Sequence, residues 1–142
     1  MLLAVIRLLA TILITCVVGV LSIGVIRAQT QTVKDGVYSD PQARRGEALY
    51  AQQCVSCHSA DLSGSGAPPL VGTEFLSNWD KMPLADLAEK IAVSMPSNSP
   101  GSLSRDQAAD LVAFILKSNK FPSGSVDLEA DAAKLKTISI IK

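Results

Sequence analysis

The sequence predicts an all-α protein, and two observations carry this prediction. Apolar residues recur with the spacing of a helix face in segments that open on good N-caps or prolines. Between these segments lie stretches rich in Pro, Gly and Ser, and none of the chain has the pattern of a credible sheet. The length of 142 residues allows one domain with an appendage.

The first segment, residues 1–28, is an export signal or a membrane anchor. It contains 21 apolar residues, and residues 8–26 carry no charge between Arg7 and Arg27. A small residue at Ala28 allows cleavage as in a secretory signal peptide. Left uncleaved, the apolar stretch would form a helix of roughly 28 Å, enough to cross a membrane. Both alternatives predict that the remainder of the chain is exported, either free in the periplasm or anchored on the exported side.

Composition limits the functions open to the exported part, residues 29–142. It carries a net charge of −2, because the 13 acidic residues of the chain all lie in it and two of the 13 basic ones do not. That balance excludes a nucleic-acid binder that works through a basic surface. Aromatic residues are few for a core, so a buried cofactor would help to fill it. The one histidine, His58, limits imidazole chemistry to a single position.

The first helix of the exported part is expected over residues 40–53. Residues 29–39 are polar and are expected to be a linker. Ser39 or Asp40 is the expected N-cap, with a proline at the first helical position. Gly46 lies inside this helix and costs stability relative to Ala. Its presence makes sense if another backbone crosses the helix closely at that point.

Two further helices follow a turn-rich loop over residues 59–72. The second helix begins at Pro83 and ends before Pro96. After another loop, the third begins at Ser104, which forms a capping-box pattern with the glutamine three residues later. Their apolar faces consist of Leu84, Leu87, Ala88 and Ile91, and of Ala108, Leu111, Val112 and Ile115.

The end of the chain extends beyond the three-helix domain. The domain is expected to cover residues 40–120, and residues 121–142 to pack on it as a C-terminal extension. Within the extension, residues 127–136 favour a short helix, and residues 137–141 favour an extended end.

The sequence Cys54-Val55-Ser56-Cys57-His58 predicts covalent attachment of one haem c. Two thiols three positions apart lie on one side of a helical turn, so each can add to one vinyl group of the haem. The adjacent His58 then projects toward the iron. A redox-active Cys pair would need a thioredoxin-like βαβ context, which is absent, and a zinc site would need a fourth ligand. A disulfide between Cys54 and Cys57 would be short and strained.

The sixth iron ligand is predicted to be Met95, with Met82 or an open position as the alternatives. Ligation by two histidines of one molecule is excluded, and ligation by His and Met is usual in electron transfer. Met95 follows a helix and precedes a proline in a loop, so irregular backbone can present its thioether. Met82 stands at the start of the second helix, where a flexible core side chain is the simpler role.

The exported region resembles a class I cytochrome c over residues 40–120. The resemblance rests on Cys54–His58, Pro68-x-Leu70-x-Gly72, Met95-Pro96 and the closing helix Leu111–Leu116. It implies a fold of helices around one covalently bound haem, with the first and last helices crossing. In that crossing, Gly46 and Tyr50 would face Leu111 and Phe114.

The resemblance also implies a hydrogen bond behind the iron ligand. An imidazole that binds iron usually donates its other N–H to a carbonyl, and here the backbone carbonyl of Pro68 would accept it. The predicted cofactor-binding residues are Cys54, Cys57, His58, Met95 and Pro68, and the predicted iron ligands are His58 and Met95.

A narrower similarity concerns cytochromes that accompany quinoprotein alcohol dehydrogenases. It rests on Met95-Pro96, Pro100–Leu103, Phe114 and Asn119–Pro122. It suggests a quinoprotein dehydrogenase as donor, with a terminal oxidase or another cytochrome as acceptor. With both axial positions of the iron filled, a substrate cannot coordinate, so the domain is expected to carry single electrons and not to be an enzyme. Nucleic acid is not an expected partner, and a membrane is one only through residues 8–26. The alternatives are a tethered subunit of a dehydrogenase or respiratory complex, and a haem enzyme or gas sensor with an open iron position.

Overall fold

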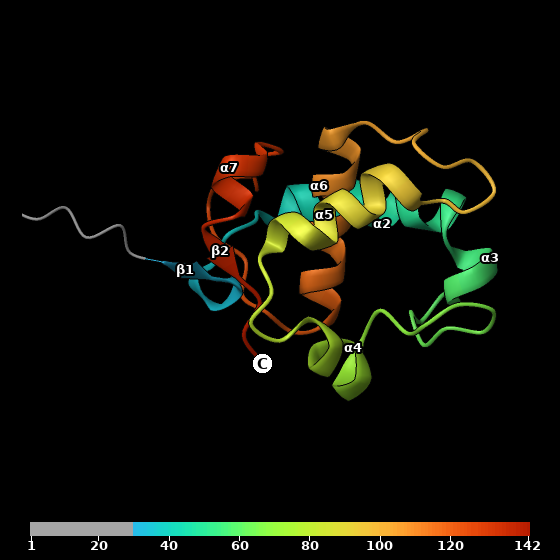
Figure 1. Ribbon diagram of the computed structural model, residues 1–142, viewed down its shortest axis with the longest axis horizontal. Coiled ribbons are helices and arrows are strands. Elements are labelled where there is room, and N and C mark those ends of the chain that lie inside the picture. Colours follow the sequence, from blue (N-terminus) through green and yellow to red (C-terminus); the bar gives the residue numbers. More distant parts are fainter. Residues whose placement is uncertain (1–29) are drawn as a thin grey trace, which may run out of the picture.

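The computed structural model describes residues 30–142, which form a mostly helical fold (Figure 1). The elements are β1 (Gln31–Thr32), the 3-10 helix η1 (Val33–Asp35), α2 (Asp40–Gln53), α3 (Val55–His58), α4 (Gly72–Trp79), α5 (Leu84–Ser94), α6 (Arg105–Ser118), α7 (Ala132–Leu135) and β2 (Ile138–Ser139). The predicted helical class is confirmed. The expected signal peptide or anchor, residues 1–28, lies outside the described residues. In the part described, no helix is both long and apolar enough to cross a membrane.

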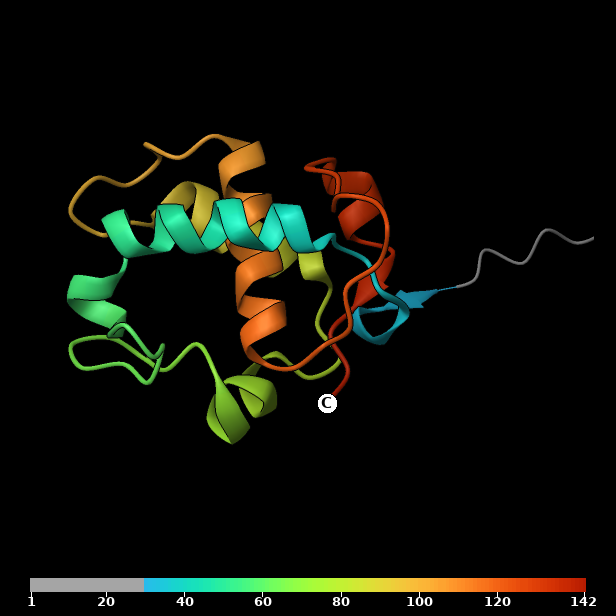
Figure 2. The same ribbon diagram turned by 180° about the vertical axis from the view of Figure 1, so that it is seen from behind.

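The two longest helices of this part, α2 and α6, cross near the middle of the molecule (Figure 2). At Gly46 of α2, a Cβ atom would lie 1.9 Å from the carbonyl oxygen of Asp110 and 3.0 Å from the Cβ atom of Phe114. The expectation that another backbone passes Gly46 is therefore confirmed. A side chain at this position would overlap main-chain atoms of α6, so the crossing depends on glycine.

Helix starts follow the predicted caps. The Ser39 hydroxyl accepts a hydrogen bond from the N–H of Gln42, and Asp40 is the first residue of α2. At the start of α6, Ser104 and Gln107 make both hydrogen bonds of the capping box. These bonds satisfy N–H groups that have no partner within the helix. α4 begins without a side-chain cap, so no start pattern in the sequence predicts it.

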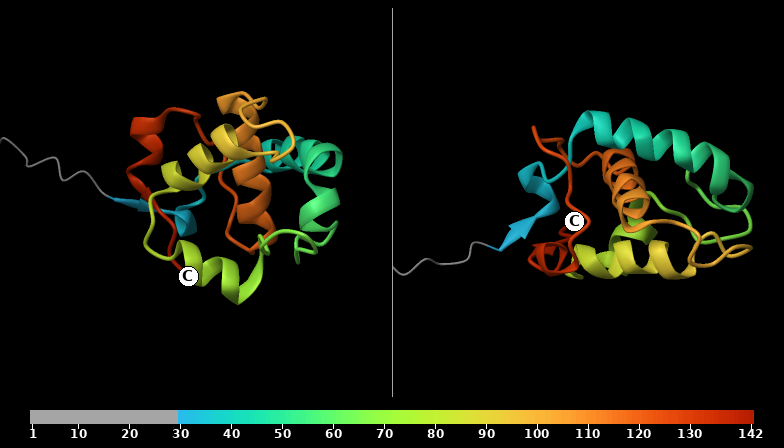
Figure 3. Two further views of the ribbon diagram at one scale, coloured as in Figure 1. Left: turned by 45° about the vertical axis from the view of Figure 1, so that its right-hand side comes forward. Right: turned by 90° about the horizontal axis from the view of Figure 1, so that it is seen from above.

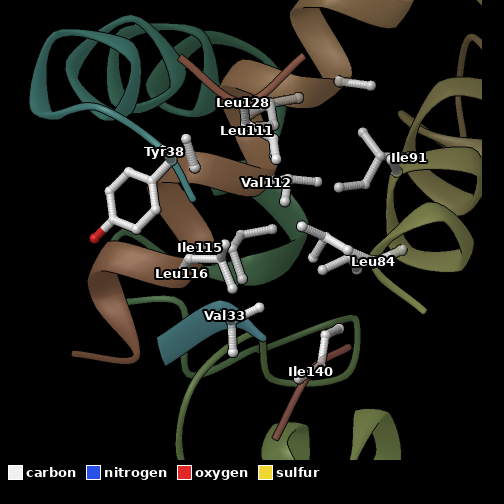
Figure 4. Packing of buried hydrophobic residues seen from close by; sticks show 14 of the residues in the cluster. Val33, Tyr38, Leu84, Ile91, Leu111, Val112, Ile115, Leu116, Leu128 and Ile140 are labelled. Carbon is white, nitrogen blue, oxygen red and sulfur yellow. The ribbon is translucent and has the colours of Figure 1, made fainter. Parts of the chain in front are cut away.

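The hydrophobic core surrounds α6 and draws side chains from the whole described chain (Figure 4). Its largest fully buried side chains are Val33, Tyr38, Phe75, Leu84, Leu111, Val112, Leu116 and Ile140. Two of these come from the segment before α2, and one from the last residues of the chain. Both terminal segments are therefore parts of the core and not appendages to it.

The expectation of a linker over residues 29–39 is wrong for the residues that the structure describes. Val33 and Tyr38 are 0% and 1% exposed, and β1 pairs in parallel with β2 through Gln31↔Ile138. A strand of two residues is too short to leave an alternating pattern in the sequence. Its partner lies more than 100 residues away, so only the tertiary fold reveals the pairing.

The C-terminal extension runs back over the start of α2. The side-chain amide of Gln42, which is buried, donates to the carbonyl of Leu128 at 2.9 Å and accepts from its N–H at 2.6 Å. Further on, the N–H of Ile140 donates to the carbonyl of Met82 at 2.9 Å. The helix expected over residues 127–136 is limited to α7, which Asp131 caps. These contacts hold the extension on the domain through its backbone.

The molecule thus has two different ends along its longest axis (Figures 1 and 3). At one end lie α3 and the loops over residues 59–71 and 95–104, and we call this the loop end. At the other lie β1, η1, α7 and β2, and we call this the terminal end. The α2–α6 crossing connects the two.

Candidate haem site

The Cys-x-x-Cys-His segment forms one short helical turn at the loop end. Cys54 ends α2, with its N–H donating to the carbonyl of Tyr50 at 2.9 Å, and α3 follows at once. The N–H of His58 returns to the carbonyl of Cys54 at 2.9 Å. Cys54 is half-buried, Cys57 is exposed, and both thiols are free. The turn therefore gathers two thiols and an imidazole on one short piece of backbone.

The imidazole of His58 is oriented by the loop that follows it. Its Nδ1 lies 2.9 Å from the carbonyl oxygen of Pro68, the acceptor that the resemblance implied. A carbonyl oxygen accepts hydrogen bonds and cannot donate them, so Nδ1 carries the proton in this contact. The lone pair of a neutral imidazole is then on Nε2, the nitrogen left free to bind a metal ion.

Backbone hydrogen bonds fix the loop against α3. The N–H groups of Ser65 and Gly66 both donate to the carbonyl of Cys57 at 3.1 Å, and that of Gly64 donates to the carbonyl of His58 at 2.9 Å. These carbonyls stand at the C-terminal end of α3, where a helix leaves them without partners. The loop is therefore ordered by the same turn whose histidine it orients.

Tyr50 provides a second support that sequence analysis missed. Its hydroxyl donates to the carbonyl of Ser59 at 2.7 Å, and its ring centroid lies 5.2 Å from that of Phe114 on α6. Burial raises the pKa of Tyr50 to about 12, so the hydroxyl stays protonated and remains a donor. The sequence indicated Tyr50 only as a contact in the helix crossing, because nothing in its spacing predicts the bond to Ser59.

Asn119 provides a third support, at the end of the loop. Its Nδ2 donates to the carbonyls of Leu70 and Ile115, each at 2.9 Å, and its Oδ1 accepts from the N–H of Gly72 at 3.1 Å. One amide therefore ties the start of α4 and the end of the loop to α6. A single Asn after a helix has no sequence pattern that predicts this role.

Met95 follows the last residue of α5 and begins the loop over residues 95–104 at the loop end. Its N–H donates to the carbonyl of Ile91 at 3.1 Å, its own backbone is extended, and its side chain is half-buried. The bond from Met95 to Pro96 is cis. The loop that begins here lies at the same end of the molecule as α3 in all views (Figures 1 to 3).

Met82 belongs to the segment between α4 and α5. Its N–H donates to the carbonyl of Trp79 at 3.1 Å, and its carbonyl accepts the N–H of Ile140 from the C-terminal extension. The backbone of Met82 is thus tied to the terminal segments, while that of Met95 opens the loop beside the Cys-x-x-Cys-His turn.

The apolar side chains around the loop end are only partly covered. The set that packs against the core without being buried in it comprises Leu49, Cys54, Val55, Leu70, Val71, Leu76, Trp79, Ala92, Leu103, Phe114 and Phe121. Of these, Val55 lies in α3 with Cys54 just before it, Leu70, Val71 and Leu103 lie in the two loops, and Leu76 and Trp79 lie in α4. A porphyrin is a flat apolar group with one polar edge, and such half-covered side chains suit its faces. Together with two thiols and an oriented imidazole, they fit a covalently held haem.

The two other chemistries considered for the Cys-x-x-Cys sequence fit less well. A reactive Cys pair has a thiolate stabilised by its surroundings, whereas burial raises the pKa of the Cys54 thiol. Among residues 30–142, no three His, Cys, Asp or Glu side chains gather closely enough to hold a metal ion, as a zinc site would require.

Comparisons with known proteins identify the family. The family described as "Cytochrome C oxidase, cbb3-type, subunit III" matches residues 41–115. The cytochrome c-551 of Bacillus subtilis is 31% identical over 93 residues, which cover 66% of this chain and 78% of that protein. The chain belongs to the cytochrome c family. This cytochrome therefore has the covalently bound haem that its family implies.

Two longer proteins also match this cytochrome over part of their length. The thiosulfate dehydrogenase of Allochromatium vinosum is 36% identical over 85 residues, which are 54% of this chain and 32% of that protein. The sulfane dehydrogenase SoxCD of Paracoccus pantotrophus aligns with a TM-score of 0.47 and 25% identity, covering 70% of this chain and 55% of that one. The chain thus spans about a third of the first of these relatives and about half of the second.

Proposed function

We propose that this cytochrome carries single electrons through one haem c, which thioether bonds from Cys54 and Cys57 hold and which His58 and Met95 ligate. The observation that carries the proposal is the 2.9 Å contact between Nδ1 of His58 and the carbonyl of Pro68. This contact fixes the tautomer and the ring orientation that iron ligation requires. The bound iron would supply the one-electron change between its ferric and ferrous states.

Met95 is the better sixth ligand because of where its backbone leads. It ends α5 in extended conformation and opens the loop at the same end of the molecule as α3. Met82 has its carbonyl engaged by the N–H of Ile140, in a segment that the C-terminal extension fixes. A thioether ligand raises the reduction potential relative to a second imidazole, which suits an acceptor of electrons from a dehydrogenase.

The protein's own residues would keep the iron six-coordinate and half-buried. With His58 and Met95 both bound, a substrate cannot coordinate the iron, so the chain itself would transfer electrons and make no bonds. The apolar side chains beside the two loops would limit water near the iron, which favours its less charged form. The hydrogen bonds of Tyr50 and Asn119 would hold the loops in place during the change of charge.

The place of this reaction would be outside the cytoplasm. Residues 1–28 have the pattern of a signal peptide or an anchor, and the cytochrome would act in the periplasm or on the exported side of the membrane. We propose a quinoprotein dehydrogenase as electron donor and a terminal oxidase as acceptor, on the narrower similarity of residues 95–122.

Replacing Met95 tests the ligand assignment directly. Met95→Ala should abolish the absorption band that arises from charge transfer between a thioether and ferric iron, and should lower the reduction potential. The matched variant Met82→Ala should keep the band. If Met82→Ala loses the band and Met95→Ala keeps it, Met82 is the ligand. If the unmodified protein binds carbon monoxide without denaturation, the open-site haem enzyme or gas sensor replaces our proposal.

A second candidate function is that of a tethered subunit in a dehydrogenase or respiratory complex. The observation in its favour is that one relative named a dehydrogenase contains the matching region as about a third of its length. Extraction of the native membranes with mild detergent separates the candidates. A complex subunit would migrate with dehydrogenase activity at high mass, whereas a free carrier would elute as a small protein in the soluble fraction.

A further inference from the structure

The charged residues of this cytochrome are unevenly distributed along the chain. Residues 48–73 contain one charged side chain, that of Asp61, and residues 91–104 contain none when His58 is counted as neutral. By contrast, residues 127–136 alone contain five. The net charge of the exported part is therefore a poor description of any single face.

The two charge-poor stretches come together at the loop end. They comprise α3, the loop over residues 59–71 and the loop over residues 95–104, which lie at one end of the molecule in every view (Figures 1 to 3). Apart from Asp61, which is exposed, their exposed residues are small, polar or apolar and include Ser63, Ser65, Gly66, Pro68, Ser97, Asn98, Ser99 and Pro100. Val93, two residues before Met95, is 54% exposed. The carboxylate of Asp61 accepts hydrogen bonds from the N–H and the hydroxyl of Ser63, at 3.1 Å and 2.6 Å.

The charged surface lies elsewhere. A hollow formed by the starts of α2 and α6 and by the segment before α7 is lined by Arg45, Asp106, Asp110, Asp127, Glu129 and Asp131. Partners that recognise charge would therefore be drawn to this side, away from the Cys-x-x-Cys-His turn.

We infer that this cytochrome exchanges electrons with a redox protein whose own contact rim is uncharged and formed by apolar and small polar side chains. The inference rests on the proposed function, because it takes the loop end as the site of electron exchange. The rim of the loop end carries one carboxylate, that of Asp61, which Ser63 already engages, so it offers little counter-charge to a charged partner, whose groups would lose water without compensation. A neutral partner loses little hydration free energy on contact. Transient electron-transfer contacts also need only a small area.

Two consequences distinguish this contact from an electrostatically steered one. Association would proceed at the rates of unsteered encounters, and these would hardly change with ionic strength. A single charge placed on the loop end would change the rate. The same charge placed on the terminal end would not, because the two ends lie at opposite sides of the molecule (Figure 1) and exposed charges more than about 10 Å apart are largely screened at moderate salt.

Electron self-exchange provides a partner of known chemistry, namely a second copy of the same chain. In this reaction a ferrous copy is oxidised as a ferric copy is reduced, so two rims of the same low charge meet and no net change occurs. The rate is measured by NMR line broadening in partly reduced, haem-loaded protein over a range of ionic strength. Asn98→Lys and Asn98→Asp place a charge in the exposed loop after Met95, and Ala133→Lys and Ala133→Asp place the same charges on α7.

We expect the rate for the unmodified protein to stay nearly constant with ionic strength. Each Asn98 variant should slow self-exchange about twofold to fivefold at low salt, through repulsion of like charges across the contact, and high salt should restore the rate. A mixture of the Lys and Asp variants should exchange faster than either alone. The Ala133 variants should match the unmodified protein.

Two results would overturn the inference. In the first, the self-exchange rate of the unmodified protein rises with salt as steeply as that of Asn98→Lys. In the second, the Asn98 and Ala133 variants change the self-exchange rate equally. Absorption spectra, recorded before the rates, distinguish these two results from a failure of the proposed function. Loss of the low-spin spectrum with its thioether band would contradict the ligation by His58 and Met95, independently of any salt dependence.

Discussion

The two ends of this cytochrome are held together in different ways. At the terminal end, backbone pairs with backbone, and side chains such as Val33 and Ile140 are fully buried. At the loop end, backbone bonds hold only the first loop to α3, single side chains add further bonds to loop carbonyls, as Tyr50 does to Ser59 and Asn119 to Leu70, and the apolar side chains stay half-covered. The terminal end is complete as a protein core. The loop end is arranged so that a flat apolar cofactor can share its packing.

This difference predicts which substitutions should affect stability and which should affect the haem. Changes at the terminal end should alter the free energy of unfolding and leave the haem spectrum as it is. Changes at the loop end should alter the spectrum or the reduction potential even where stability hardly changes. The α2–α6 crossing belongs to both ends, so changes there should affect both properties.

The largest combined effect, on both the free energy of unfolding and the haem spectrum, is expected at the crossing, from Gly46→Ala. The new Cβ atom would lie 1.9 Å from the carbonyl oxygen of Asp110, so the two helices must separate. Overpacking of a core costs about 1–3 kcal/mol and occasionally more, and an overlap with main-chain atoms belongs at the upper end of that range or above it. Urea unfolding followed by circular dichroism measures the loss. Gly66→Ala is the matched control, because a Cβ atom there has nothing within 4 Å, and an equal loss in both variants would contradict the role of the crossing.

The next effect is expected at the terminal end, from Ile140→Ala. Ile140 is 0% exposed, and truncating such a side chain costs about 2–5 kcal/mol. The thioether absorption band should nevertheless persist in the folded variant, because the substitution lies far from the loops. Val126→Ala, at a position 67% exposed, should leave both the unfolding midpoint and the band unchanged. Loss of the band in Ile140→Ala would remove the distinction between the ends.

The sequence predicts the part of this fold that local chemistry determines. The caps at Ser39 and Ser104 bind N–H groups three residues away, and Gly46 marks the crossing by its cost inside a helix. The Cys-x-x-Cys-His turn is likewise local, since its residues share one helical turn. Such features depend on neighbours in the chain, so spacing alone reveals them.

The parts that sequence analysis missed depend on distant partners. The supposed linker is buried because β1 pairs with β2, and no composition rule describes a strand of two residues. The bond from Asn119 to Leu70 joins residues 49 positions apart. Bonds of one side chain to one distant carbonyl leave no periodic pattern in the sequence, and such bonds support the loops of the loop end.

A matched pair of tyrosines provides a sharper test of the two ends. Tyr38 at the terminal end and Tyr50 at the loop end each donate a hydroxyl hydrogen bond of 2.7 Å, to the carbonyls of Phe121 and Ser59. Replacing either with Phe should cost about 1 kcal/mol of unfolding free energy. Only Tyr50→Phe should also shift the reduction potential, because Ser59 adjoins His58. Equal shifts in both variants, measured by redox titration, would show that the two ends are not independent.

The smallest expected effect concerns acid stability beside the start of α2, where the C-terminal extension packs on the domain. Asp127 accepts hydrogen bonds from Ser39 and from Arg45, the latter at 2.8 Å, and Arg45 also makes a bidentate pair with Asp110. The bond from Ser39, followed by that from Arg45, lowers the pKa of the Asp127 carboxyl. Because the folded pKa is below that of the unfolded chain, the charged form stabilises the fold above about pH 4.

The stabilisation by Asp127 must therefore disappear as the pH falls from about 4 through its lowered folded pKa. Asp127→Asn should be slightly less stable than the unmodified protein at neutral pH, since an exposed pair contributes little, and the difference should shrink at low pH. Thermal unfolding at pH 7 and at steps below pH 4 measures it. A difference that stays constant over this range would mean that Asp127 acts through packing, because a contribution from its charge cannot survive its protonation.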